Sequence, residues 1–164
     1  MHSIVAALAL CLAATAAQAA DFKIGFVDAE RINRESAPAE RAARQLEKEF
    51  GPRQQELQRR EAQIKALQSQ LEKEAVTMSE SERRAKEQEL ARMSIEFQRL
   101  QREFREDLNI RRNQEISALL ERANRVIRQI AEAEKFDLIV QDAVYRSPRI
   151  DITDRVLKAL AEGK

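Results

Sequence analysis

The side chains best suited to nucleophilic catalysis and to metal binding are scarce in this chain. Its 164 residues include one cysteine, Cys11, and one histidine, His2. Both lie in residues 1–19, a segment whose pattern predicts a secretory signal peptide that is removed on export. The mature chain would then contain no thiol and no imidazole. This excludes Ser-His-Asp and Cys-His catalysis, ordinary zinc sites and disulfide bonds.

The signal-peptide prediction depends on an uncharged N-terminal segment. Residues 1–20 contain no Lys, Arg, Asp or Glu, and an apolar run extends over residues 4–12. The run is followed by Ala17-Gln18-Ala19, whose small residues at both ends are typical of a cleavage site, so we place the cut after Ala19. The alternative is a membrane anchor, but the run is shorter and richer in alanine than a good spanning helix.

The groups that remain for catalysis are carboxylates, lysines, hydroxyl groups and Tyr145. No two acidic residues have a sequence context that indicates a cleft or a raised pKa, and no Gly-rich phosphate-binding loop is present. Tyr145 lies in an expected strand, where packing in a barrel is its more common role. The net charge of +1 gives no strong field to attract nucleic acid. We therefore predict no catalytic residue, no metal site, no cofactor and no nucleic-acid partner, and we do not expect an enzyme.

The longest structural feature expected in this chain spans residues 38–135, and it must position any functional surface. Charged residues make up 35% of the chain and aromatic residues 4%, which is the composition of a coiled coil rather than of a compact enzyme. A break at Val76-Thr77-Met78-Ser79 divides the stretch into two arms. The sequence therefore predicts one long antiparallel helical hairpin, with its tip near residues 76–80.

Short local signals mark the ends of the two arms. Ser36 is expected to cap the first arm, with Pro38 in its first turn. Ser79 and Glu82 have the spacing of a capping box at the start of the second arm. Gly51-Pro52 lies inside the first arm, where a proline removes a helical hydrogen bond, and it predicts a kink or a hinge.

The apolar residues of the hairpin form a narrow seam rather than a broad face. A companion row in the first arm is only half apolar, because it includes Arg53, Arg60 and Glu74. A seam this thin joins two helices but does not bury a large core. The second arm is the longer one, and we expect its denser apolar region, 116–130, to lie against the base. The main row recurs every seven residues and comprises Ala43, Phe50, Leu57, Ile64, Leu71 and Met78, with Leu46 and Leu67 in the companion row.

Two sets of arm residues are candidates for binding a partner. The apolar set either contacts a partner or packs in the seam, and methionine is the best candidate because it adapts to many shapes. The arginine set forms either a basic stripe or a solvated face balanced by nearby carboxylates. The apolar set comprises Met78, Met93, Phe97 and Phe104, and the stripe comprises Arg99, Arg102, Arg105, Arg111 and Arg112.

The segments that flank the hairpin predict a small α+β base, residues 20–37 and 136–164. Strands are expected over 22–28, 136–141 and 144–147, with Phe22, Ile24 and Phe26 on one buried face, and a closing helix after 151 capped by Asp151 or Thr153. So small a sheet has open edges, so we expect several copies to close it into a β-barrel body. The candidate assembly residues are Phe22, Ile24, Phe26, Leu138, Val140, Val144, Tyr145, Ile152, Val156 and Leu160.

Motifs at both ends of the mature chain resemble those of the Skp/OmpH family of periplasmic chaperones. The first three are Lys23-Ile24-Gly25-Phe26-Val27-Asp28, Glu35-Ser36-Ala37-Pro38 and Gln45-Leu46-Glu47-Lys48-Glu49-Phe50. The later ones are Phe136-Asp137-Leu138-Ile139-Val140, Ala143-Val144-Tyr145 and Asp151-Ile152-Thr153-Asp154, with Val156-Leu157-Lys158 after them. They stand in the order of the family and cover most of the mature chain.

The resemblance implies a homotrimer in which helical tentacles project from a β-barrel body and enclose a cavity. It implies a periplasmic, ATP-independent holdase that binds unfolded outer-membrane proteins, with lipopolysaccharide as a further partner. From the residues alone a second function stays open, which is a structural coiled-coil envelope protein or an adaptor that binds a folded partner. Such a protein is expected to have a stronger seam and no β-rich base.

Overall fold

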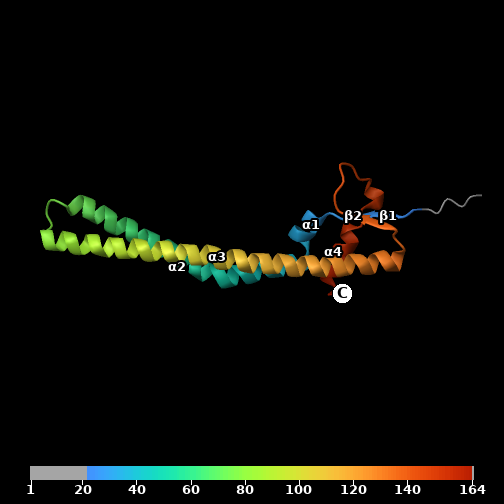
Figure 1. Cartoon of the computed structure of the whole chain (residues 1–164), viewed down its shortest axis with the longest axis horizontal. Coiled ribbons are helices and arrows are strands. Elements are labelled where there is room, and N and C mark those ends of the chain that lie inside the picture. Colours follow the sequence, from blue (N-terminus) through green and yellow to red (C-terminus); the bar gives the residue numbers. More distant parts are fainter. Residues whose placement is uncertain (1–21, 164) are drawn as a thin grey trace, which may run out of the picture.

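The computed structural model describes residues 22–163 and has a long helical hairpin with a small base at one end (Figure 1). The predicted signal peptide lies outside the described residues. The antiparallel hairpin predicted from the sequence is confirmed. In chain order the elements are β1 (Ile24–Phe26), α1 (Ala29–Glu35), α2 (Ala37–Glu74), α3 (Glu80–Glu134), β2 (Leu138–Val140), the 3-10 helix η1 (Pro148–Ile150) and α4 (Thr153–Ala161).

The predicted caps are present at the start of both arms. The Ser36 hydroxyl oxygen accepts a hydrogen bond from the Ala39 N–H at 3.3 Å. At the tip, the Ser79 side chain accepts from the Glu82 N–H while the Glu82 carboxylate accepts from the Ser79 N–H, which completes the capping box. Helix α2 continues through Pro52 as one element, so a hinge at this point stays a prediction.

The seam between α2 and α3 is apolar but thin. Phe50 and Ile64 are buried, Leu57 and Leu71 are half-buried, and Ala43 is exposed. Among the described residues, no helix is long and apolar enough to cross a membrane. The contact along the seam is what buries the apolar residues of the two long helices.

Charged residues in the companion row reach across the seam to α3. Arg53 is 2.8 Å from Asp107, and Arg60 is 3.1 Å from Glu96. Exposed pairs of this kind contribute little stability, roughly 0–1 kcal/mol each. Their main effect is to fix which turn of α2 lies beside which turn of α3.

The base is built on a parallel pair of strands covered by the end of α3 and by α4. β1 pairs with β2 in the register Ile24 to Leu138, Gly25 to Ile139 and Phe26 to Val140. The expectation that the excess length of the second arm packs against the base is confirmed, because α3 supplies two residues to the core. The buried core cluster consists of Val27, Ile32, Ala123, Val126, Ile152, Val156 and Leu160.

The face of β1 that meets this core differs from the expected one. Val27 belongs to the core, and a Cβ built on Gly25 would lie 3.2 Å from a ring carbon of Phe136, so the strand lies very close to that ring. On the other face of the sheet Ile24 is 37% exposed, and of the three residues expected to be buried there only Phe26 is buried, at 3% exposure. Alternation alone could not show which face is covered, because Gly25 has no side chain that marks its face as buried.

The expected third strand, 144–147, is not formed. Val144 and Tyr145 project into solvent, with relative exposures of 110% and 83%. The free edge of β1 is instead occupied by a single bridge from Phe26 to Asp151, with the Ile152 N–H donating to the Phe26 carbonyl at 2.9 Å. A strand needs a neighbouring strand, and this segment of the chain has none.

The start of α4 agrees with the prediction only in part. The N-cap position is Ile152, which provides no side-chain cap. One residue earlier, the Asp151 carboxylate accepts from the Thr153 N–H at 2.9 Å. The Thr153 side chain is fully buried, and its oxygen accepts from the Asp28 N–H at 2.9 Å, so it joins the start of α1 to α4 rather than capping the helix.

Lys135→Gly is expected to raise the free energy of unfolding by about 1 kcal/mol. Lys135 ends α3 with a backbone φ of 57°, in the left-handed region. A residue with a Cβ is sterically strained in this region, whereas glycine adopts it without strain. Urea unfolding would measure the gain. Lys158→Gly inside α4 is the matched control, and it is expected to lower stability by about 1 kcal/mol. A loss at Lys135 similar to that at Lys158 would contradict the prediction.

Candidate functional site

The four apolar arm residues predicted to bind a partner lie along the hairpin. Met93, Phe97 and Phe104 are half-buried on α3, and Met78 is half-buried at the tip. The Phe104 ring packs edge-on against Phe50, with 5.8 Å between ring centroids and 76° between ring planes. Phe104 is therefore a seam residue, and each of the four keeps part of its surface open to solvent.

The predicted basic stripe is only partly available for a partner. Arg99 pairs with Glu103 at 2.6 Å, and Arg111 pairs with Glu49 and Glu115. Within the described part of the chain, no ion pair involves the other three arginines, Arg102, Arg105 and Arg112. Two of the five arginines thus belong to the solvated, balanced face that the sequence left open as an alternative.

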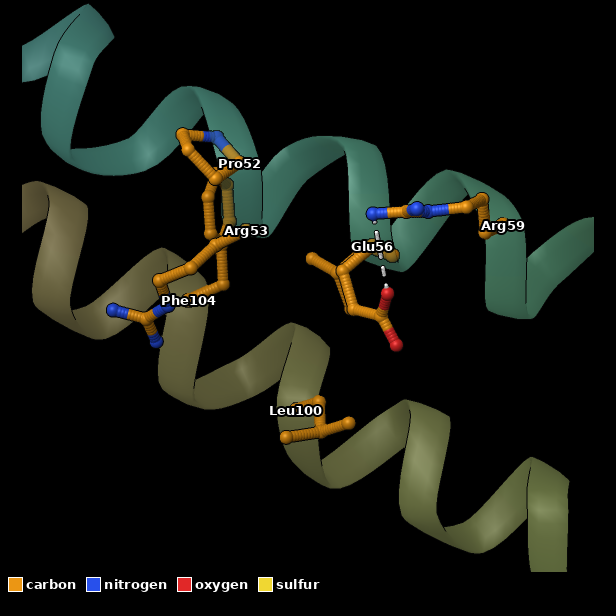
Figure 2. Close-up of a pocket in the computed structure, with 7 residues that line it drawn as sticks. Pro52, Arg53, Glu56, Arg59, Leu100 and Phe104 are labelled. Carbon is orange, nitrogen blue, oxygen red and sulfur yellow. Dashed lines mark ion pairs between the residues drawn. The ribbon is translucent and has the colours of Figure 1, made fainter.

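A hollow of about 350 Å³ lies between α2 and α3 beside Pro52 (Figure 2). Leu57, Leu100 and Phe104 give it apolar walls. The guanidinium of Arg53 lies at its edge, 5.5 Å from the Phe50 ring centroid and 5.8 Å from that of Phe104. The complete lining is Pro52, Arg53, Glu56, Leu57, Arg59, Leu100 and Phe104.

The ten candidate assembly residues differ in how far the single chain buries them. Phe26, Ile152, Val156 and Leu160 are buried within the single chain. Val140 is half-buried. The remaining five form the exposed apolar surface of the base, and they are Phe22, Ile24, Leu138, Val144 and Tyr145.

Arg146 ties the exposed loop before η1 to the sheet. Its guanidinium carbon is 4.4 Å from the centroid of the Phe26 ring, and its nitrogens lie 3.3 Å from the Asp28 carboxylate and 3.1 Å from the Asp151 carboxylate. Thr153 joins the same network through its contacts with Asp28 and Asp151. This network fixes the loop at Arg146, while the neighbouring Val144 and Tyr145 stay exposed to solvent.

Acid is expected to weaken the base through Asp151. Burial on its own raises the pKa of this carboxyl group, but hydrogen bonds from Thr153 and the charge of Arg146 outweigh burial and leave the pKa below its ordinary value. The folded state therefore gains stability from the ionised form above the unfolded pKa. That stability is lost as the pH falls through the lower, folded pKa.

Asp151→Asn should thus reduce stability at neutral pH and flatten the loss of stability below about pH 4. Urea unfolding at a series of pH values would measure both effects. Asp142→Asn, at an exposed carboxylate of the same loop, is the matched control and should keep the wild-type slope. An unchanged slope in Asp151→Asn would contradict a stabilising role for this carboxylate.

Sequence reasoning missed the hollow and the Arg146 network for the same reason. Arg146 and Asp28 are separated by 118 positions, and Arg53 and Asp107 by 54. Neither pair has a local pattern that predicts the contact. The one usable signal was Arg53 in the half-apolar companion row of the seam, because a charged residue at a seam position can leave a gap in the packing.

The comparisons with known proteins agree with one another. The profile of the family described as outer membrane protein (OmpH-like) matches residues 23–160. A chaperone protein Skp from Yersinia enterocolitica is 33% identical over 156 residues, covering 93% of this chain and 94% of the relative. The chaperone protein Skp of Escherichia coli K12 is 34% identical over 158 residues, covering 94% and 95%. The crystal structure of an OmpH-like protein from Caulobacter crescentus superposes with a TM-score of 0.71 at 17% identity, covering 86% of this chain and 85% of the other.

Proposed function

The chain belongs to the OmpH-like outer membrane protein family, and from this premise we propose that it is an ATP-independent holdase chaperone of the periplasm. Its clients are unfolded outer-membrane proteins, which it binds between helical arms and keeps from aggregating. Relatives that match nearly the whole chain carry the name chaperone, and this supports the chaperone role.

The observation that carries the proposal is the arm itself. Helices α2 and α3 share a thin seam, whose apolar residues are mostly half-buried rather than enclosed. Such an arm offers many weak contacts to an extended chain and releases it without chemical work. The client leaves when it reaches a fold or a partner of higher stability.

We propose further that three copies assemble through the base, because several arms can enclose a client that one arm cannot. Two strands with exposed apolar residues at their edge are marginal alone. The exposed apolar surface of the base is the part of the chain best placed to meet a second copy, and a closed β-barrel body would cover it. The unpaired Arg102, Arg105 and Arg112 would then be available to acidic client segments or to lipopolysaccharide.

Native mass, measured with and without a client, tests the proposal. The expected result is three protomers alone, and three protomers with one client after a urea-unfolded outer-membrane barrel protein is diluted into the solution. A monomer or dimer that lets the barrel protein precipitate would overturn the holdase and favour the structural coiled-coil alternative.

Replacing Met78 and Met93 with serine tests where along the arm the client binds. Weaker protection of the unfolded barrel protein by light scattering is expected, because serine removes adaptable apolar surface. Met93 lies on the seam side of α3, so the variant's helix content would be checked by circular dichroism. Full protection by a folded variant would remove both methionines from the client-binding surface.

A further inference from the structure

The hollow beside Pro52 is formed by ordered side chains rather than by loose packing. Arg53 occupies a seam row, but its guanidinium turns outward to the Asp107 carboxylate at 2.8 Å. On the way it lies over the rings of Phe50 and Phe104. An apolar residue in this position would fill the space between the helices, whereas an arginine that extends to the edge leaves the space beyond it open.

The size and walls of the hollow suit a ring-bearing side chain. A cavity of about 150 Å³ is enough to hold benzene, so about 350 Å³ leaves room for an indole or a phenol ring. Leu57, Leu100 and Phe104 supply apolar contacts. Figure 2 shows Glu56 between the two helices, and its carboxylate pairs with Arg59 at 3.4 Å and with Arg60 at 2.9 Å.

The charges at the rim favour an amphipathic aromatic guest over an aliphatic one. Guanidinium groups such as those of Arg53 and Arg59 are attracted to the electron-rich face of an aromatic ring. The Glu56 carboxylate can accept a hydrogen bond from an indole N–H or a phenol O–H. Tyrosine and tryptophan use the apolar wall, the cations and the acceptor together, while leucine uses only the wall.

We propose that this hollow is a seat for a tyrosine or tryptophan side chain of an unfolded outer-membrane barrel protein, an inference that rests on the proposed function. Transmembrane β-barrels carry girdles of aromatic residues at both membrane interfaces, so such clients present these side chains repeatedly. An extended client that lies along the arm can insert one ring here without separating α2 from α3. The seat thus gives the arm a preferred contact among many weak ones.

Filling the hollow should weaken the binding of the client. Leu57→Trp places an indole in the space, and the Kd for a urea-unfolded outer-membrane barrel protein is expected to rise about fivefold, the equivalent of about 1 kcal/mol of ring contacts. Leu67→Trp, at a half-buried seam leucine that does not line the hollow, is the matched control and should raise the Kd much less, because it removes one weak seam contact and fills no hollow. The chain contains no tryptophan, so fluorescence of each introduced indole reports whether it is buried.

A pair of peptides tests the chemistry of the guest. One is a short amphipathic β-strand peptide with a single tryptophan, and the other has leucine in that place. The wild-type protein should prefer the tryptophan peptide about fivefold, and Leu57→Trp should abolish the preference. An equal affinity of the wild-type protein for the two peptides would overturn the seat.

Three further outcomes distinguish a failure of the seat from a failure of the proposed function. Failure of the wild-type protein to hold the barrel protein would reject the holdase function itself. If the wild-type protein holds the barrel protein but Leu57→Trp and Leu67→Trp change the Kd equally, only the seat is rejected. A changed native mass in Leu57→Trp without client would assign the hollow to a second copy and overturn the proposal.

Should Leu57→Trp fail to fold, a photo-crosslinking residue at Arg59 replaces it. This rim position should form several-fold more client adducts than Gln55, an exposed position of α2 that does not line the hollow.

Discussion

Replacing Leu160 with alanine is expected to lower the free energy of unfolding of the base by about 2–5 kcal/mol. Leu160 lies on α4 with no exposed surface, and it packs in the cluster that contains Val126 and Ile152. Truncation removes apolar contacts and leaves a cavity that a base of this size has few other side chains to fill. Because α4 is a single short helix, the loss would release it from α3 and from the end of β1.

Urea unfolding of the base would measure this loss, and native mass would show its effect on the proposed assembly. Leu120→Ala is the matched control, since Leu120 lies on α3 with 46% of its surface exposed, and it should cost only a few tenths of a kcal/mol to about 1 kcal/mol. Equal losses in the two variants would show that α4 does not anchor the base. If Leu160→Ala lost its oligomeric mass and Leu120→Ala kept it, the packing of the core within one chain would be shown to be necessary for the contacts between copies.

The hairpin was predictable from the sequence because its signals are local. The seven-residue spacing that includes Phe50 and Ile64 and the capping box at Ser79 each act over one or two helical turns. Neither signal depends on any distant part of the chain. The helices, the caps and the tip could therefore be inferred before the structure was known.

The base was less predictable because its order depends on distant partners. Alternation in β1 left open which face meets the helices, and the answer depends on the close approach of the Phe136 ring to Gly25. Val144 and Tyr145 have the composition of a strand, yet Asp151 occupies the edge of β1. Contacts between residues more than a hundred positions apart decide both points, and no local pattern encodes them.

The candidate site also combines features that local sequence predicts with features that depend on distant contacts. The seam positions of Met93, Phe97 and Phe104 follow from periodicity, and their half-burial agrees with it. The hollow depends on where the Arg53 side chain goes, which is settled by Asp107 on the other arm. A charged residue at a seam position indicates an interruption of the apolar packing, but it does not predict whether the result is a gap, an ion pair across the seam or a kink.

Replacing Phe50 with alanine is expected to destabilise the middle of the arm by about 3 kcal/mol while leaving the base folded. Phe50 is 4% exposed, and it is one of only two buried apolar residues in α2. It also holds the edge-on contact with Phe104 and lies under the Arg53 guanidinium. A thin seam has no neighbouring core residue that could take over this burial.

Native-state hydrogen exchange separates the arm from the base. Amides around Phe50 and Phe104 should exchange about a hundredfold faster in Phe50→Ala, which corresponds to about 3 kcal/mol, whereas amides of β1 and α4 should not change. Ile95→Ala, at a residue 69% exposed on α3, is the control and should leave exchange in the arm unchanged. Faster exchange in arm and base alike would show that they unfold as one unit. Because Phe104 also forms a wall of the hollow, selective loosening of the arm should weaken the proposed client binding together with exchange protection. A parallel loss of both would show that the proposed seat depends on an ordered seam.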